Sequence, residues 1–179
     1  MSVGASGAAR RFSLLLDASV WIDYYLGYRP LHKQACELVR LAVKLDADML
    51  YAATSSKDLF FLIAADFKRE YRRAHAGVLD AGGAASADAM AWGCLDHLTE
   101  NAVAVGCDLP DIWLARKQRP LHADYEDNLI VAAAQRAQAD LLVTSDERLL
   151  RHCPVAALDI PDAIAALRVR ASDAGVPED

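Results

Sequence analysis

The sequence alternates short apolar runs with longer stretches of helical periodicity, and this alternation restricts the possible folds more than any other feature. The apolar runs are FSLLLDA at 12–18, ADMLYAAT at 47–54, NAVAVGC at 101–107, DLLVTSD at 140–146 and the weaker VAAL at 155–158. Short apolar runs bounded by small or turn-forming residues are typical of buried parallel strands. Strands that alternate with helices favour a parallel sheet covered by helices on both faces. We therefore predict an α/β fold with three layers, α/β/α, around a central sheet of about five strands.

Apolar residues recur at three- and four-residue steps between these runs, which is the spacing of one helix face. Helices are predicted at 30–45, 55–75, 86–98, 109–118 and 124–139, and after Pro161. Ser55 and Ser86 are suitable N-caps for two of them. The small residues AGGAAS at 81–86 predict a loop.

The length of 179 residues fits one domain. We expect flexible tails at 1–11 and 171–179 and a folded domain at 12–170, because both ends are rich in small and polar residues. No apolar stretch approaches the ~20 residues that span a bilayer, so no membrane segment and a cytoplasmic location are expected. The four cysteines form no CxxC pair, and neither a zinc site nor a disulfide framework is indicated.

Two of the predicted strands end in an acid: Asp17 follows LLL, and Asp146 follows LLVTS. The carboxyl ends of parallel strands meet at one edge of a sheet, where ligands of α/β proteins bind. Asp58 and Asp127 lie in the first turns of two predicted helices that start near this edge. The sequence therefore allows these four acids to converge, although they are spread over most of the chain.

Clustered carboxylates repel one another unless a cation neutralises them, and oxygen ligands favour Mg²⁺ or Mn²⁺. Such ions serve phosphodiester hydrolysis. The competing interpretation is structural, because Asp58, Asp124, Glu126 and Asp127 are also suited to capping helix N-termini. None of the five histidines has ligand spacing, and they are left out of the expected chemistry.

Other polar residues have a weaker pattern. Ser19 and Thr144 stand beside the strand-terminal acids and can position water or phosphate, although turn hydrogen bonding is their commoner use. Ser19 also excludes an aspartate-nucleophile phosphatase, whose pattern needs a second acid there. Solvated helix faces are expected for Asp23, Asp66 and Asp96. Basic residues that are candidate contacts to RNA, although they also suit helix C-termini, form two groups: Lys68, Arg69, Arg72 and Arg73, and Arg116, Lys117 and Arg119.

Four segments resemble, in order and spacing, a bacterial PIN domain over residues 12–168. They are LLLDASVWIDYYLG, TSSKDLFFLI, DYEDNLIVAAAQRAQADLLVTSDERLL and IPDAIAAL. The resemblance implies a parallel five-stranded sheet and a Mg²⁺- or Mn²⁺-dependent ribonuclease centre of three or four acids. Asp17, Asp58, Asp127 and Asp146 match its acidic positions, and Asp124 matches an additional acid of some members. The family more often has glutamate where Asp58 stands. Ser19 and Thr144 match the small polar residues beside its metal site.

Many such proteins resemble VapC-type toxins, which cleave RNA and are silenced by a small antitoxin partner. The resemblance therefore implies an endoribonuclease that acts on single-stranded or structured RNA, an antitoxin-like partner and a homodimer. Hydrolysis would leave 5′-phosphate and 3′-hydroxyl ends. The alternative is a PIN-like scaffold that binds RNA or protein without cutting. Because all four matching positions are acidic, the active nuclease is the favoured hypothesis.

Overall fold

The computed structural model describes residues 10–176, and its centre is one sheet of five strands. The strands are β1 (Ser13–Leu16), β2 (Asp48–Ala52), β3 (Val103–Val105), β4 (Leu141–Val143) and β5 (Ala157–Leu158). Their order is β3-β2-β1-β4-β5, and all four neighbouring pairs are parallel. This confirms the predicted α/β fold. Because the strand order reverses between β1 and β4, the carboxyl ends of these two strands are the expected ligand edge.

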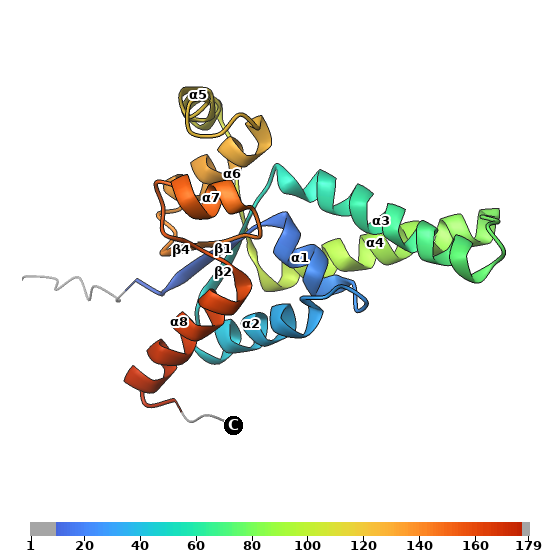
Figure 1. Ribbon diagram of the computed structural model, residues 1–179, viewed down its shortest axis with the longest axis horizontal. Helices are drawn as coiled ribbons and strands as arrows, with labels where there is room; N and C mark the ends of the chain where they lie inside the picture. The colour runs from blue at the N-terminus through green and yellow to red at the C-terminus, as the bar shows by residue number, and fades with distance from the viewer. Residues whose placement is uncertain (1–9, 177–179) are drawn as a thin grey trace, which may run out of the picture.

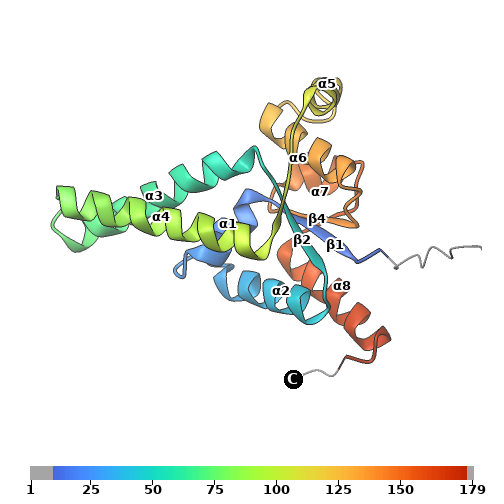
Figure 2. The same cartoon turned by 180° about the vertical axis from the view of Figure 1, so that it is seen from behind.

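Helices cover both faces of the sheet (Figure 1; Figure 2). On one face, α1 (Ala18–Tyr25), α2 (His32–Lys44) and α8 (Ile160–Asp173) pack on Leu14 and Leu16 of β1. On the other, α6 (Tyr125–Arg136) and α7 (Glu147–His152) pack on Leu15. Successive side chains of a strand point to opposite faces, so β1 contributes to both cores and is completely apolar.

Two long helices form a hairpin that projects from the side of the domain (Figure 1). They are α3 (Ser55–Ala74) and α4 (Ala81–Asn101). The loop predicted at 81–86 is wrong, because α4 begins at Ala81, capped by Asp80. Gly83 is needed there for packing, since a Cβ atom on it would lie 2.4 Å from the ring of Tyr71. The predicted N-cap Ser55 lies inside α3, which starts after Thr54.

The described residues extend slightly beyond the predicted domain. The last helix, α8, continues to Asp173, three residues past the predicted boundary at Arg170. Most of the predicted N-terminal tail, residues 1–9, lies outside the described residues, as do residues 177–179 of the C-terminal one. Within residues 10–176, no helix is long and apolar enough to span a membrane. The remaining helix, α5 (Leu109–Lys117), packs against α6 at the periphery.

Candidate metal centre

Asp17 lies directly after β1, at the edge where the strand order reverses. Its backbone N–H donates to the carbonyl of Val143 in β4, at 2.9 Å, which continues the strand pairing to this residue. Its carboxylate is almost buried and accepts hydrogen bonds from Ala18 N (2.6 Å), Ser19 Oγ (3.0 Å) and Thr144 Oγ1 (2.8 Å). Burial raises the pKa of Asp17, although these three donors act in the opposite direction. The fold thus fixes this acid in one orientation.

Asp146 follows β4 and is the N-cap of α7. Its Oδ1 atom accepts hydrogen bonds from the backbone N–H groups of Arg148 (2.8 Å) and Leu149 (2.9 Å). Burial acts to raise the pKa of Asp146, but these donors and the neighbouring His122 outweigh it and hold the pKa below its usual value. The cap therefore uses Oδ1, and Oδ2 makes no hydrogen bond within residues 10–176.

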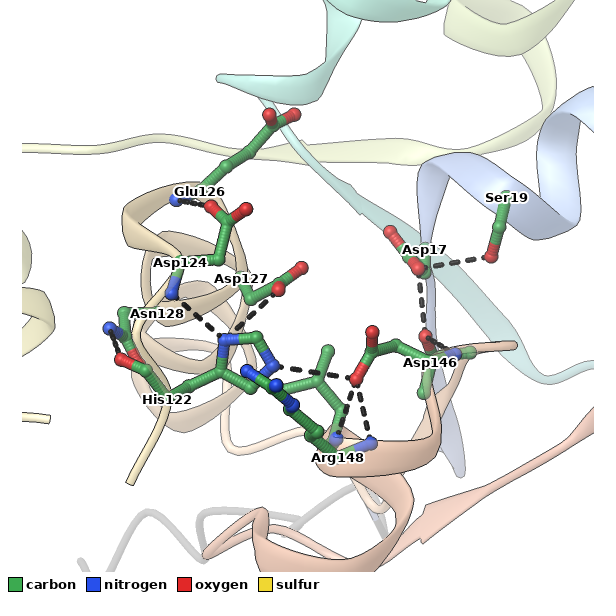
Figure 3. Close-up of polar contacts among 11 residues, drawn as sticks. Asp17, Ser19, His122, Asp124, Glu126, Asp127, Asn128, Asp146 and Arg148 are labelled. Carbon is green, nitrogen blue, oxygen red and sulfur yellow. Dashed lines mark hydrogen bonds and ion pairs between the residues drawn. The ribbon is translucent and has the colours of Figure 1, made fainter. Parts of the chain in front are cut away.

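Asp127 enters from the first turn of α6, and His122 connects it to Asp146 (Figure 3). The Nδ1 atom of His122 lies 3.1 Å from Asp127 Oδ2, and its Nε2 atom lies 3.5 Å from Asp146 Oδ1. Burial raises the pKa of Asp127 to about 6; His122 opposes this, and the charges of Asp124, Asp146 and Asp17 add to it. Three acids from distant parts of the chain thus share one electrostatic site.

Three further acids lie around this centre. Asp124 caps α6 by accepting a hydrogen bond from Glu126 N at 2.9 Å, as a helix N-cap does. The side chain of Glu126 points away from His122 and Asp127 in Figure 3. Burial and, secondarily, a hydrogen bond with Asp58 raise the pKa of Glu126. The contacts of Asp58 are therefore with Glu126 and with Lys57, whose Nζ atom lies 3.3 Å away.

An open cavity of about 420 Å³ gives access to these acids. Asp17, Ser19, Glu126 and Asp127 line one part of it, and Arg29 and Asp66 line another. The donor atoms fit a hard divalent cation, because they are carboxylate oxygens in a partly buried site where two acids are hard to ionise without a counter-charge. The residues of this site could therefore hold a divalent metal ion.

His122 is the residue of this site that the sequence patterns did not single out, whereas Glu126 was expected only as an acid at a helix N-terminus. His122 is 6% exposed, and its Nε2 atom makes no hydrogen bond within the described residues, since the contact with Asp146 is too long for one. Together, His122, Asp127 and Asp146 offer ligand atoms within 4.8 Å of one another. Glu126 has a local signal, because it is an acid in the first turn of a predicted helix. His122 has no comparable signal.

The prediction of a solvated helix face is wrong for Asp23, whereas Asp66 is partly exposed. Asp23 is buried and forms an ion pair with Arg29 at 2.6 Å. Asp66 accepts a hydrogen bond from Tyr28 at 2.6 Å and lines the cavity. Both acids contact the segment that joins α1 to α2, through Arg29 and Tyr28, so this connection affects their environment as well as the periodicity of their helices.

The two basic groups differ in their surroundings. On α3, Lys68 pairs with Asp88 at 2.6 Å, Arg73 pairs with Glu70 at 2.8 Å, and Arg69 pairs with Asp66 and Glu70. Arg72 forms no ion pair among the described residues, and neither does Arg116 or Lys117. The cations of α3 are therefore largely neutralised, whereas those at the end of α5 are not.

With this fold and this acidic edge established, comparison with known proteins identifies the class. The model of the PIN domain family matches residues 13–148. The chain belongs to the PIN domain family, whose members are generally nucleases. No protein with a curated function matches the chain.

Two solved structures have the same fold. A VapBC2 complex from Rickettsia felis, bound to a DNA fragment from its promoter, aligns with a TM-score of 0.59 at 10% identity, over 83% of this chain and 98% of that one. PAE2754 from Pyrobaculum aerophilum aligns with a TM-score of 0.55 at 16% identity, over 88% of this chain and 90% of that one. At these identities the likeness shows the fold alone.

Proposed function

We propose that this protein is a Mg²⁺- or Mn²⁺-dependent endoribonuclease. The observation that carries the proposal is the convergence of Asp17, Asp127 and Asp146 at one edge of the sheet, beside an open cavity. This arrangement lowers the stability of the folded protein, because two of the three carboxylates have raised pKa values and repel one another. A bound cation would relieve this repulsion, and PIN domains are generally nucleases.

In this proposal, Asp17, Asp127 and Asp146 hold the ion, with Asp58 as a contributor through Glu126 and Asp124 as the cap of α6. When bound, the ion neutralises phosphate oxygens and lowers the pKa of a water that can attack phosphorus. Thr144 and Ser19 keep the carboxylate of Asp17 oriented by donating to its Oδ2 atom. The N–H groups of Arg148 and Leu149 hold Oδ1 of Asp146, which leaves Oδ2 for the ion.

His122 is proposed to position two of these acids. It lies between Asp127 and Asp146, and Asn128 holds its loop by donating to the His122 carbonyl at 2.8 Å. Side chains that orient metal-binding carboxylates typically change metal affinity 10- to 100-fold when removed. His122 has this role in the proposal because its ring lies between the two acids and contacts both of them (Figure 3).

We expect His122→Ala to weaken Mn²⁺ binding about tenfold, measured by titration calorimetry without substrate. His122→Asn should recover part of this affinity, because its side-chain amide can donate a hydrogen bond to Asp127. His152→Ala, at an exposed histidine at the end of α7, is the matched control and should bind Mn²⁺ as the wild type does. Unchanged affinity in His122→Ala would exclude the positioning role, whatever its effect on thermal stability.

The proposed activity is tested by incubating the purified protein with a pool of single-stranded and structured RNAs and sequencing the ends of the products. We expect cleavage in Mg²⁺ or Mn²⁺ that EDTA abolishes, with 5′-phosphate and 3′-hydroxyl ends. Cleavage that is equal with and without EDTA would contradict the metal centre. An absence of cleavage in either ion would favour the alternative, a PIN-like scaffold that binds RNA or protein.

The likeness to VapBC2 supports a second part of the proposal, that the protein is the toxin of a toxin–antitoxin pair. The solved complex is of VapBC2 with promoter DNA, and the alignment covers 98% of that chain. By this proposal the protein acts in the cytoplasm as a homodimer and is silenced by a small antitoxin-like protein. Two observations decide it: whether the neighbouring gene encodes a small antitoxin-like protein, and whether that small protein copurifies with this one.

A further inference from the structure

The outward face of α5 carries an aromatic side chain and free cations. We call Trp113, Arg116, Lys117 and Arg119 the α5 surface. The inner face of the helix is fixed on α6, where Gln118 Nε2 donates to Gln135 Oε1 at 2.7 Å and Asp108 pairs with Arg136 at 2.8 Å. This attachment leaves Trp113 58% exposed on a helix that lies at the outer end of the domain (Figure 1; Figure 2). A large aromatic ring is thus held in solvent by a rigidly attached helix.

The cations beside Trp113 are available to bind anions. Within residues 10–176, no carboxylate forms an ion pair with Arg116, Lys117 or Arg119, and the Nζ atom of Lys117 lies 5.3 Å from the centre of the Trp113 ring. Because the whole chain has a net charge of −6, a polyanion needs a local positive surface to approach it. The basic group on α3 is a weaker candidate for binding a polyanion, since three of its four members already pair with acids.

We infer that the α5 surface binds single-stranded RNA and guides it to the acidic edge. An exposed aromatic ring stacks on an unpaired base, and adjacent lysine and arginine side chains neutralise phosphates. This surface lies near the acids in the sequence: Arg119 precedes His122, which contacts Asp127 and Asp146, by three residues, and this limits the distance between the Cα atoms of Arg119 and His122 to about 11 Å. This inference rests on the proposed ribonuclease activity and assigns a binding role to residues that lie outside its metal centre.

The test measures binding without cleavage, by fluorescence anisotropy of a labelled 12-nucleotide oligouridine in EDTA. Trp113→Ala is expected to weaken binding about tenfold, the loss of one base stack. A double variant, Arg116→Gln with Lys117→Gln, is expected to reduce the slope of log affinity against log salt by about 1.4. Matched controls are Trp92→Ala, at an equally exposed tryptophan on α4, and Lys68→Gln, at a cation paired with Asp88.

Wild-type affinity in both α5 variants would overturn the inference, and so would equal binding of an RNA duplex, which cannot stack a base on Trp113. A change in molar mass by light scattering in Trp113→Ala, with RNA affinity unchanged, would assign the surface to self-association instead. Cleavage in Mn²⁺ is measured in parallel. If the wild type cleaves RNA and the α5 variants bind normally, only this inference fails; if binding behaves as expected and no cleavage occurs, the proposed function fails.

Discussion

The Asp17→Asn variant is expected to lose metal-dependent RNA cleavage by at least about 10³-fold, because Lewis-acid stabilisation of the transition state is worth several kcal/mol and about 1.4 kcal/mol is a factor of ten. The variant should fold normally. Asparagine has nearly the same shape, its oxygen can accept the bond from Ala18, and the hydroxyl groups of Ser19 and Thr144 can rotate to accept from its amide. The expected loss of activity therefore results from the removal of one negative charge from the candidate metal centre.

Cleavage of a labelled RNA, measured at saturating Mn²⁺ and over at least four decades of rate, checks this expectation. Asp96→Asn removes the same charge from an exposed position on α4 and is the matched control, with wild-type activity expected. Circular dichroism establishes that both variants are folded. A folded Asp17→Asn protein that cleaves within tenfold of the wild type would remove Asp17 from the centre.

The second large effect is on stability. In the metal-free protein, Asp127→Asn is expected to raise the free energy of unfolding by about 2 kcal/mol at pH 7.5, which corresponds to a melting temperature higher by about 4–8 °C. The reason is that the pKa of Asp127 is raised to about 6 in the folded protein, chiefly by burial, so ionising this side chain at neutral pH opposes folding. Asparagine is neutral at every pH and has no such cost.

The sign of the pH dependence follows from this pKa. The folded state holds the Asp127 proton up to about pH 6, whereas the unfolded chain releases it near pH 4. The wild type therefore loses stability from this group as pH rises from about 4 to 6. The difference in unfolding free energy between the wild type and Asp127→Asn widens over that range and then levels off. Thermal melts in EDTA between pH 4 and 8 measure this gap.

Mn²⁺ provides the control for the stability effect. An ion that binds only the folded wild type stabilises it in proportion to the logarithm of its concentration, and the Asp127→Asn protein should respond much less. Addition of Mn²⁺ should therefore narrow or reverse the difference in melting temperature. If the variant is less stable than the wild type in EDTA at pH 7.5, the electrostatic account of this site is wrong.

Periodicity was sufficient to predict the sheet and two of its acids. The apolar runs that end in Asp17 and Asp146 are local signals, and parallel pairing of β1 with β4 places their ends at the same edge. Local signals failed at 81–86, where glycine and small residues predicted a loop. Close packing of Gly83 against Tyr71 makes those same residues the first turn of α4.

The sequence by itself determined the parallel α/β fold, because the alternation of apolar runs and amphipathic segments is a local property of the chain. It also determined which acids stand at strand ends and helix starts. Only the tertiary structure decided which partners those acids have. His122 contacts Asp146, 24 residues further along the sequence, and Asp58 contacts Glu126, 68 residues further along. Such contacts depend on how helices and loops pack around the sheet, and burial then sets the pKa values that make the cluster suited to a cation.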